Sequence, residues 1–173
     1  LRIDVLDIEP KMIPFKPDII WASPPCQTFS VASISTYWGG GVGAYIPKKA
    51  KSYVGLALVQ KAKELIEHYN PKYWYIENPR GVLRKLDVVK DLPIRNTVTY
   101  CSYGDNRMKP TDIWTNDSNW KPRKMCKNGN RNCHHQPAPR GSKTGTQGLK
   151  GSYERSKVPP ELCLEILKGI NKR

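Results

Sequence analysis

Two short apolar runs, each with a proline at one end or just beyond it, flank one long stretch of helical periodicity. The runs are Pro17–Ala22 and Tyr73–Ile76, and the stretch between them is Ser52–Tyr69. A strand, helix, strand order predicts a βαβ unit, with parallel strands and a right-handed crossover. We expect Ser52 to cap the helix. Its apolar face recurs at helical spacing, at Val54, Leu58, Ala62, Leu65, Ile66 and Tyr69.

The rest of the chain adds weaker elements. Asn96–Tyr103 alternates well enough for a third strand, and Thr111–Thr115 is expected to pair with it. The glycine-rich stretch Ser35–Ser52 predicts a mobile loop. Periodicity is lost over Asn116–Tyr153, which is rich in Lys, Arg, Gly and Pro. A closing helix is predicted from Pro160, with one apolar face that contains Leu162, Ile166 and Ile170.

Two residues whose side chains could take part in catalysis follow the two predicted strands. Cys26 comes directly after Pro24 and Pro25, and Glu77 comes directly after Ile76. In parallel sheets, the chemistry gathers just past the carboxyl ends of the strands. A thiolate is a nucleophile when exposed, and a nearby acid can protonate a ring nitrogen. The simpler alternatives are an inert, half-buried thiol and a surface carboxylate at a strand end.

The charge favours an anionic partner. The chain has 29 Lys and Arg against 15 Asp and Glu, a formal net charge of +14. Neutralising phosphates releases counterions, so nucleic acid is the first expectation, with a generically basic protein as the alternative. No apolar run approaches the roughly 20 residues of a membrane span. Five irregularly spaced cysteines indicate a reduced environment. We therefore expect a cytoplasmic protein without a membrane partner.

Five segments in order resemble the DNA cytosine-5 methyltransferase family, from Asp4 to about Ile170. "ASPPCQTFS" resembles its catalytic Pro-Cys motif and "YWYIENPRG" its Glu-Asn motif. "YCSYGDNRMKPTDIW" occupies the place of its "YG…Q.R.R" segment, and "ERSKVPPELCLEIL" resembles its closing "GNSVPP" motif. "IDVLDI" resembles the segment whose acid binds the adenine of S-adenosylmethionine. The pattern is closest to short, phage-type members.

The resemblance implies an α/β fold, with a Rossmann-like S-adenosylmethionine-dependent sheet and a small irregular basic recognition region. The implied divisions are a catalytic core at 1–115, a short recognition region at 116–153 and a closing helix at 154–173. The family's glycine-rich cofactor motif normally precedes the position of Asp4, and the chain begins without Met. We therefore expect an N-terminal piece to be missing, and this fragment alone to bind the cofactor weakly or not at all, with inactivity of the fragment as one possible consequence.

The family's roles transfer to matching positions. Cys26 would attack carbon 6 of a flipped cytosine, Glu77 would bond N3 and the exocyclic amine, and Asn78 would orient the Cys26 turn. Arg107, or alternatively Lys109, would place a cation near the carbonyl oxygen of the base. The implied catalytic set is Cys26, Glu77, Asn78 and Arg107. The implied cofactor contacts are Asp4, Pro24 and Ser156. The implied DNA contacts are Gln27, Ser30, Arg80, Lys109, Arg140 and Lys143.

A cysteine- and histidine-rich stretch raises the question of a metal. "CKNGNRNCHHQ" contains Cys126, Cys133, His134 and His135. A zinc ion would stabilise a segment too polar to fold by burial. However, the spacing matches no standard finger, and the fourth ligand is open, with Cys101 as one possibility. The alternative is a basic, DNA-facing loop with incidental thiols, and we assign no metal ligand from the sequence.

The resulting prediction is a monomeric enzyme that methylates carbon 5 of cytosine in double-stranded DNA, using S-adenosylmethionine, in a phage or restriction-modification setting. An amino-methyltransferase acting on cytosine N4 or adenine N6 is one alternative, although such enzymes usually carry an aromatic residue at the position of Cys26. A catalytically inactive DNA-binding module is another, and an RNA substrate remains open. The sequence does not give the recognised site.

Overall fold

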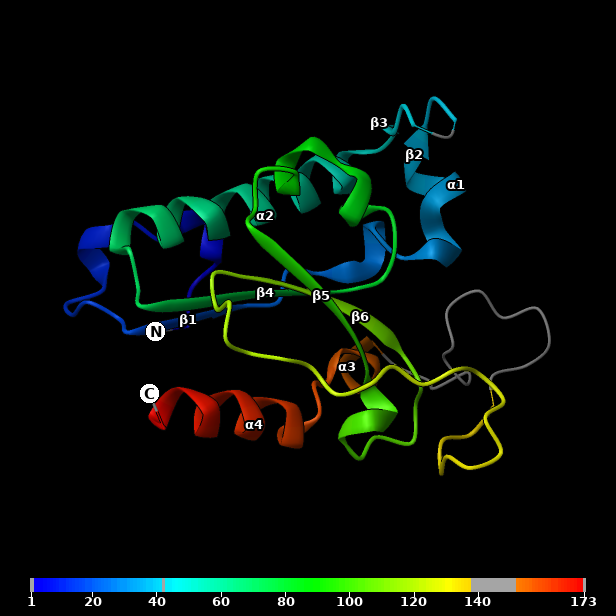
Figure 1. The fold of residues 1–173 in the computed structure, drawn as a ribbon. Coiled ribbons are helices and arrows are strands. Elements are labelled where there is room, and N and C mark those ends of the chain that lie inside the picture. Colours follow the sequence, from blue (N-terminus) through cyan, green and yellow to red (C-terminus); the bar gives the residue numbers. More distant parts are fainter. Residues whose placement is uncertain (1, 42, 138–151, 173) are drawn as a thin grey trace. The chain divides into compact units, whose positions relative to one another are not determined.

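The computed structural model describes residues 2–41, 43–137 and 152–172 (Figure 1). The chain forms two compact units, 1–95 with 112–117, and 96–111 with 118–173. The sequence-based boundaries differ, because 96–111 joins the later segment. The described sheet has the strand order β1-β4-β6-β5. Its strands are β1 (Ile19–Ala22), β4 (Tyr73–Pro79), β5 (Ile94–Thr99) and β6 (Pro110–Thr115).

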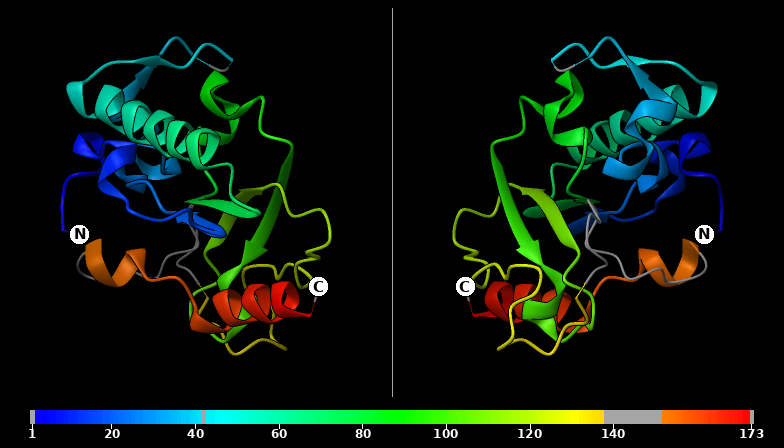
Figure 2. Two further views of the ribbon diagram at one scale, coloured as in Figure 1. Left: turned by 90° about the vertical axis from the view of Figure 1, so that its left-hand side faces the viewer. Right: turned by 90° about the vertical axis from the view of Figure 1, so that its right-hand side faces the viewer.

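The first unit contains the predicted βαβ arrangement. β1 and β4 pair in parallel, from Ile19 opposite Tyr73 to Ala22 opposite Ile76. Helix α2 (Ala50–Tyr69) connects them and lies along one face of both strands (Figures 1 and 2). β4 extends past Ile76 and ends at Pro79, so Glu77 and Asn78 lie within the strand and not after it.

The buried face of α2 differs from the predicted one. Ser52, Gly55, Val59, Ala62 and Tyr69 are buried, whereas Val54 is 48% exposed. Ser52 does not cap the helix, because its Oγ donates a hydrogen bond to Tyr37 O (2.8 Å). At Gly55 an added Cβ would lie 2.7 Å from Thr28 Oγ1. Gly55 of α2 therefore faces the turn that contains Thr28. The close approach of the two backbones determines which face of the helix is buried.

The glycine-rich stretch, predicted to be a mobile loop, contains short helical and strand elements. It contains α1 (Ile34–Tyr37) and an antiparallel pair, β2 (Trp38–Gly39) and β3 (Ile46–Pro47). The reason is Trp38, which is 4% exposed and donates from Nε1 to Thr28 O (2.6 Å). Trp38 joins the hydrophobic core of the first unit, whose other buried members are Phe29, Val59, Trp74, Ile76, Val82, Leu83, Leu86, Val89 and Trp114.

Short 3-10 turns make up much of the remaining first unit. They are η1 (Val5–Asp7), η2 (Pro10–Met12), η3 (Cys26–Thr28), η4 (Val31–Ser33), η5 (Leu83–Lys85) and η6 (Asp87–Val89). The fully buried Asp112 of β6 accepts hydrogen bonds on both carboxylate oxygens from Arg84. A buried carboxylate is costly without such a partner.

The second unit has less regular structure. β5 ends at Thr99 and the chain turns into η7 (Tyr100–Tyr103), so the predicted third strand starts and ends earlier than expected. Helix α3 spans Ser152–Ser156 and α4 spans Pro160–Asn171. Leu162 and Ile166 are buried as predicted, while Cys163 is half-buried and not a core residue. The described residues 118–137 contain no helix or strand. Among the described helices, none has the length and apolar character needed to cross a membrane.

Candidate functional site

The turn that carries Cys26 is held by hydrogen bonds at nearly every carbonyl. Cys26 is half-buried and begins η3, four residues after the end of β1. Cys26 O accepts from the backbone N–H groups of Phe29 and Ser30, both at 3.0 Å. Gln27 O accepts from Ser33 Oγ (2.6 Å). A turn with so few unsatisfied carbonyls has little freedom to change shape, and this fixes the position of the thiol.

Residues distant in sequence also form hydrogen bonds to the carbonyl groups of this turn. Asn78 is fully buried, and its Nδ2 donates to Pro24 O (2.9 Å), the backbone contact that the family resemblance implies. Trp38 bonds Thr28 O, and Val82 N donates to Phe29 O (2.8 Å). The sequence analysis missed Trp38. The tryptophan that precedes three glycines could have indicated this contact, because a large aromatic side chain is usually buried even when the residues around it favour a loop.

Glu77 lies at the same end of the sheet. It follows Ile76, the register partner of Ala22, and is only 4% exposed. The carboxyl ends of parallel strands meet at one edge. Glu77 lies within β4 and not after it as predicted, but it is beyond the last residue paired with β1, so it shares that edge with the Pro24–Cys26 turn.

Gly81 joins the Glu77 strand to the Cys26 turn. It forms an isolated antiparallel bridge with Ser30, and an added Cβ would lie 2.1 Å from Phe29 O. Because that atom is backbone, no side-chain rotation relieves the contact. The glycine in "ENPRG" therefore has a packing reason that the sequence analysis did not identify.

Replacing Gly81 with alanine is expected to lower the free energy of unfolding by about 2–3 kcal/mol, the upper range of overpacking. The measurement is urea denaturation of both proteins. Gly39→Ala is the matched control, because its Cβ would meet the flexible side chain of Lys48 at 3.2 and 3.3 Å, and the backbone atom Ile46 O only at the ordinary contact distance of 3.9 Å. Equal stability of the two variants would show that the contact with Phe29 is not restrictive.

An apolar cavity of about 290 Å³ lies beneath the end of β1. It is lined by Val5, Ile20, Trp21, Ala22, Ser23, Pro24, Pro25, Leu58, Ala62 and Leu65. Asp4 immediately precedes one lining residue, and its Oδ1 accepts from Leu6 N (3.0 Å). The cavity is thus lined by β1, the Pro24–Pro25 turn and α2, and Asp4 lies next to it in sequence.

Arg107 is engaged inside the second unit. It is 7% exposed, and its Nε donates to both carboxylate oxygens of Asp105, at 2.8 and 3.0 Å. Its Nη1 donates to Glu154 O (2.9 Å) and its Nη2 to Lys157 O (3.1 Å). Burial would raise the pKa of Asp105, but the hydrogen bonds and charge of Arg107 outweigh it, so the pKa is lowered. This arrangement ties the 105–107 turn to the segment before α4.

Lys109 has a similar position. It is 4% exposed, and its Nζ donates to Arg155 O (2.8 Å) and lies 4.5 Å from the centre of the Tyr100 ring. In this structure the cations of Arg107 and Lys109 are thus directed at main-chain carbonyls of 154–157. Ser156 is exposed, and its Oγ donates to Tyr153 O (2.7 Å).

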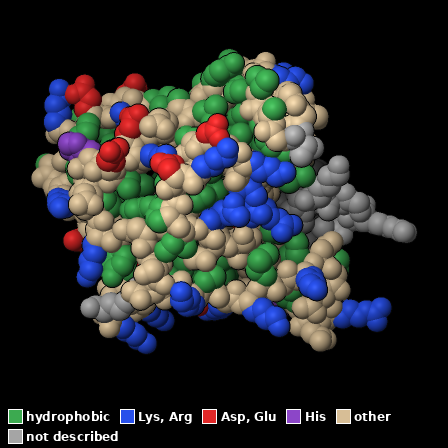
Figure 3. Space-filling model, turned by 45° about the horizontal axis from the view of Figure 1, so that its top comes forward, with side chains coloured by type: hydrophobic (Ala, Val, Ile, Leu, Met, Phe, Trp, Pro, Cys, Tyr) green, Lys and Arg blue, Asp and Glu red, His purple; other side chains and the backbone are tan. Residues whose placement is uncertain are grey.

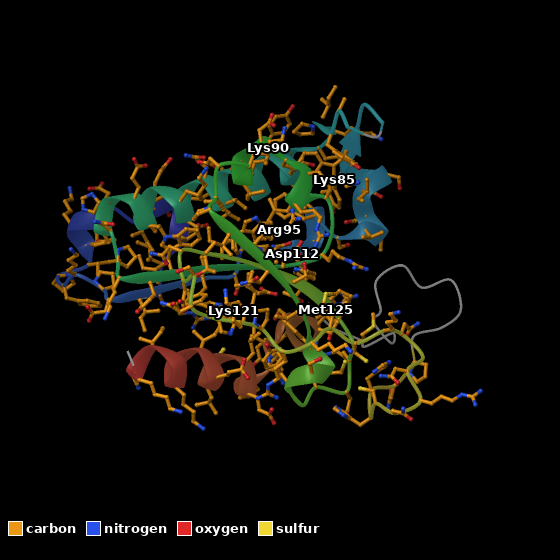
Figure 4. The ribbon with its side chains drawn as sticks, in the orientation of Figure 1. Lys85, Lys90, Arg95, Asp112, Lys121 and Met125 are labelled. Atoms are coloured by element: carbon orange, nitrogen blue, oxygen red, sulfur yellow. The ribbon has the colours of Figure 1, made fainter. Side chains whose placement is uncertain are left out.

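The other predicted DNA contacts fall into two groups. Gln27 and Arg80 are exposed in the first unit, and Ser30 is half-buried. Arg140 and Lys143 lie outside the described residues. Figure 3 shows Lys and Arg side chains gathered near the centre of one face. In the first unit, Lys85, Lys90 and Arg95 are exposed cations, marked on the ribbon in Figure 4. These side chains give that unit a surface suited to phosphates.

Potential metal ligands occur in the second unit. Cys101, Cys126, Cys133 and His135 come together there, whereas His134 Nε2 donates to Asp105 O (3.0 Å) instead. Burial raises the pKa of the Cys101 thiol to about 12, and the neighbouring Cys126 and Cys133 add to the shift.

Two comparisons with known proteins show the family of this chain. The family model described as C-5 cytosine-specific DNA methylase matches residues 2–94. A probable DNA (cytosine-5)-methyltransferase of Frog virus 3 (isolate Goorha) is 32% identical over 181 residues, which cover 96% of this chain and 82% of the viral protein. The family match includes Cys26, Glu77 and Asn78, and it ends before the cysteine and histidine cluster.

Proposed function

The chain belongs to the C-5 cytosine-specific DNA methylase family and is a DNA (cytosine-5)-methyltransferase, and from this premise we propose that it uses Cys26 as a covalent nucleophile on a cytosine flipped out of double-stranded DNA. The observation that carries the proposal is the turn of Cys26, held by Asn78 at Pro24 O, with the buried Glu77 at the same strand edge. An enzyme that acts on a base inside a duplex must first extrude that base.

Cys26 attacks carbon 6 of the ring as the thiolate, and electron density moves to carbon 5. The fixed turn supports this step because it holds the sulfur in one place without reorganisation. Once carbon 5 carries the new methyl group, loss of its proton and elimination of the thiolate restore the aromatic ring. The cysteine is therefore regenerated in every cycle.

Glu77 is proposed to hold the base by its N3 and exocyclic amino group. Charge develops on the ring as sulfur adds, and a proton shared with the carboxyl group neutralises it. Burial supports this role, because hydrogen bonds to a substrate are stronger where water is excluded.

S-adenosylmethionine supplies an electrophilic methyl group when bound. The proposed binding residues are Asp4 and Pro24, because Pro24 lines the apolar cavity at the end of β1 and Asp4 precedes Val5, another lining residue. Ser156 remains a predicted cofactor contact. In this assignment Asp4 accepts from the amino group of the base, and the apolar walls cover its faces.

For DNA, the proposed contacts in the first unit are Gln27, Ser30 and Arg80, with exposed cations such as Lys85 bonding phosphates. Arg140 and Lys143 remain predictions from the sequence. We propose a different role for Arg107 and Lys109, because both are buried and donate to carbonyls of 154–157. They position that segment and do not contact the base directly.

A trapping experiment tests the covalent mechanism. Duplexes of randomised sequence that contain 5-fluorocytosine are mixed with the full-length gene product and S-adenosylmethionine, then resolved on a denaturing gel. Fluorine at carbon 5 blocks the final proton loss, so a protein–DNA adduct is expected to survive denaturation. The controls are the same pool with cytosine and a reaction without S-adenosylmethionine. DNA binding without any adduct would contradict the mechanism and favour transfer to an exocyclic amine.

A further inference from the structure

Four potential zinc ligands converge in the second unit. The Sγ atoms of Cys101, Cys126 and Cys133 and a ring nitrogen of His135 all lie within 4.8 Å of one another. Zinc bonds of about 2.3 Å to sulfur and 2.0–2.1 Å to nitrogen, arranged tetrahedrally, require separations of roughly 3.5–3.8 Å between ligands. Cys126 Sγ and His135 Nδ1 are 3.7 Å apart. One separation thus matches a tetrahedral zinc site, and the others are within about 1 Å of the required range.

The backbone holds the ligands in place independently of any metal. Cys101 lies in η7, directly after β5. Cys126 N donates to Thr99 Oγ1 (2.8 Å), and Gln136 N, next to His135, donates to Asn106 O (3.0 Å). The three ligands from the irregular segment are thus attached on both sides to the chain around η7.

The turn between Cys126 and Cys133 has its own internal bonds. Asn130 N donates to Lys127 O (3.2 Å) and Cys133 N donates to Asn130 O (3.1 Å). Asn130 Nδ2 also donates to Cys126 Sγ (3.5 Å). Amide donors to sulfur are typical surroundings of metal-bound thiolates, since they stabilise the negative charge.

The segment 118–137 has little apolar burial that would stabilise its fold. The described residues 118–137 contain no helix or strand, and Trp120 and His135 are the buried side chains among them. A segment with so little apolar burial cannot offset its conformational entropy through a core. A structural metal site provides that stabilisation directly.

We propose that Cys101, Cys126, Cys133 and His135 bind one Zn²⁺ ion as a structural site. Three thiolates and one imidazole form a ligand set that favours zinc over harder cations. The ion joins η7 to the irregular segment and fixes the chain at His135, three residues before the basic stretch 138–151. This proposal does not depend on the proposed methyl transfer.

The test measures zinc in protein purified under reducing conditions without chelator, by mass spectrometry of the metal. About one zinc per chain is expected for a closed four-ligand site. Cys133→Ser and His135→Ala are expected to lose the ion. The matched controls are Cys163→Ser, on α4, and His134→Ala, next to the proposed ligand; both are expected to keep it.

Cobalt substitution keeps the test decisive if a ligand variant fails to fold. The unaltered protein, stripped of metal and reloaded with Co²⁺, is expected to show the visible bands of tetrahedral cobalt and a thiolate charge-transfer band. Absence of uptake of both Zn²⁺ and Co²⁺ by the reduced protein would overturn the proposal. So would zinc that is lost in His134→Ala but retained in His135→Ala, or a disulfide between two of the three cysteines in the protein as purified.

Discussion

Replacing Cys26 with serine is expected to reduce methyl transfer on the order of 10³-fold or more, as loss of a nucleophile does in other covalent enzymes. A serine hydroxyl is nearly the same size, but it is not ionised at neutral pH and adds poorly to carbon 6. The hydrogen bonds that hold the turn use backbone groups of residues 24–30, so the variant should keep its fold. The measurement is transfer of labelled methyl groups to duplex DNA.

Two further readouts make the Cys26→Ser result specific. The adduct with 5-fluorocytosine should disappear, while the dissociation constant for DNA should stay within about twofold, because the substitution leaves the charge unchanged. Cys163→Ser is the matched control and should retain full activity. Normal methylation by Cys26→Ser would exclude the covalent mechanism, even if DNA binding were unaffected.

Replacing Glu77 with glutamine is expected to slow methyl transfer by about 10²–10⁴-fold, the usual contribution of a positioned acid or base. Glutamine preserves the shape of the side chain, but it cannot share a proton with N3 of the ring. Addition of Cys26 should therefore slow, and the fluorinated adduct should accumulate more slowly. The measurement is single-turnover methyl transfer as a function of pH.

Glu67→Gln provides the control for Glu77→Gln, because Glu67 is an exposed carboxylate on α2. It should behave as the unaltered protein. A Glu77→Gln variant with normal rates across the pH range would assign the carboxyl group a structural role only. The thermal midpoint of each variant separates that outcome from simple loss of folded protein.

The sequence predicted the end of β1 and the parallel pairing of β1 with β4, because both follow from local signals. A short apolar run before Pro24 and another before Asn78 were sufficient to bring Cys26 and Glu77 to one edge of a parallel pair. The crossover helix was also evident from its periodicity. These features depend on neighbours in sequence and on the fixed geometry of βαβ units.

The sequence failed where backbones approach closely. The rotation of α2 follows from contact between Gly55 and Thr28, and no hydropathy pattern contains that information. Likewise, a glycine-rich sequence predicts a loop, and the sequence does not show that Trp38 donates a hydrogen bond to Thr28 O. On α2, close packing buries small residues such as Gly55, and not the larger apolar residue Val54 that the periodicity predicted.

Long-range partners account for the other differences. Arg107 was predicted to stand beside the substrate, yet its guanidinium bonds Asp105 and carbonyls about fifty residues later in the chain. The cysteine and histidine cluster includes Cys101, which precedes the irregular segment. It also includes His135, whereas the neighbouring His134 bonds Asp105 O. Adjacent histidines are equivalent in a sequence pattern, and only the fold distinguishes them.

The held turn around Cys26 has a consequence for how the free energy of DNA binding is used. Asn78, Trp38 and Val82 already fix the turn in the unbound protein. In the proposed mechanism the substrate therefore does not assemble the nucleophile, and the free energy of the DNA contacts is available for extrusion of the stacked base. Sequence preference would then reflect how easily a given base leaves the helix, in addition to any direct recognition of its neighbours.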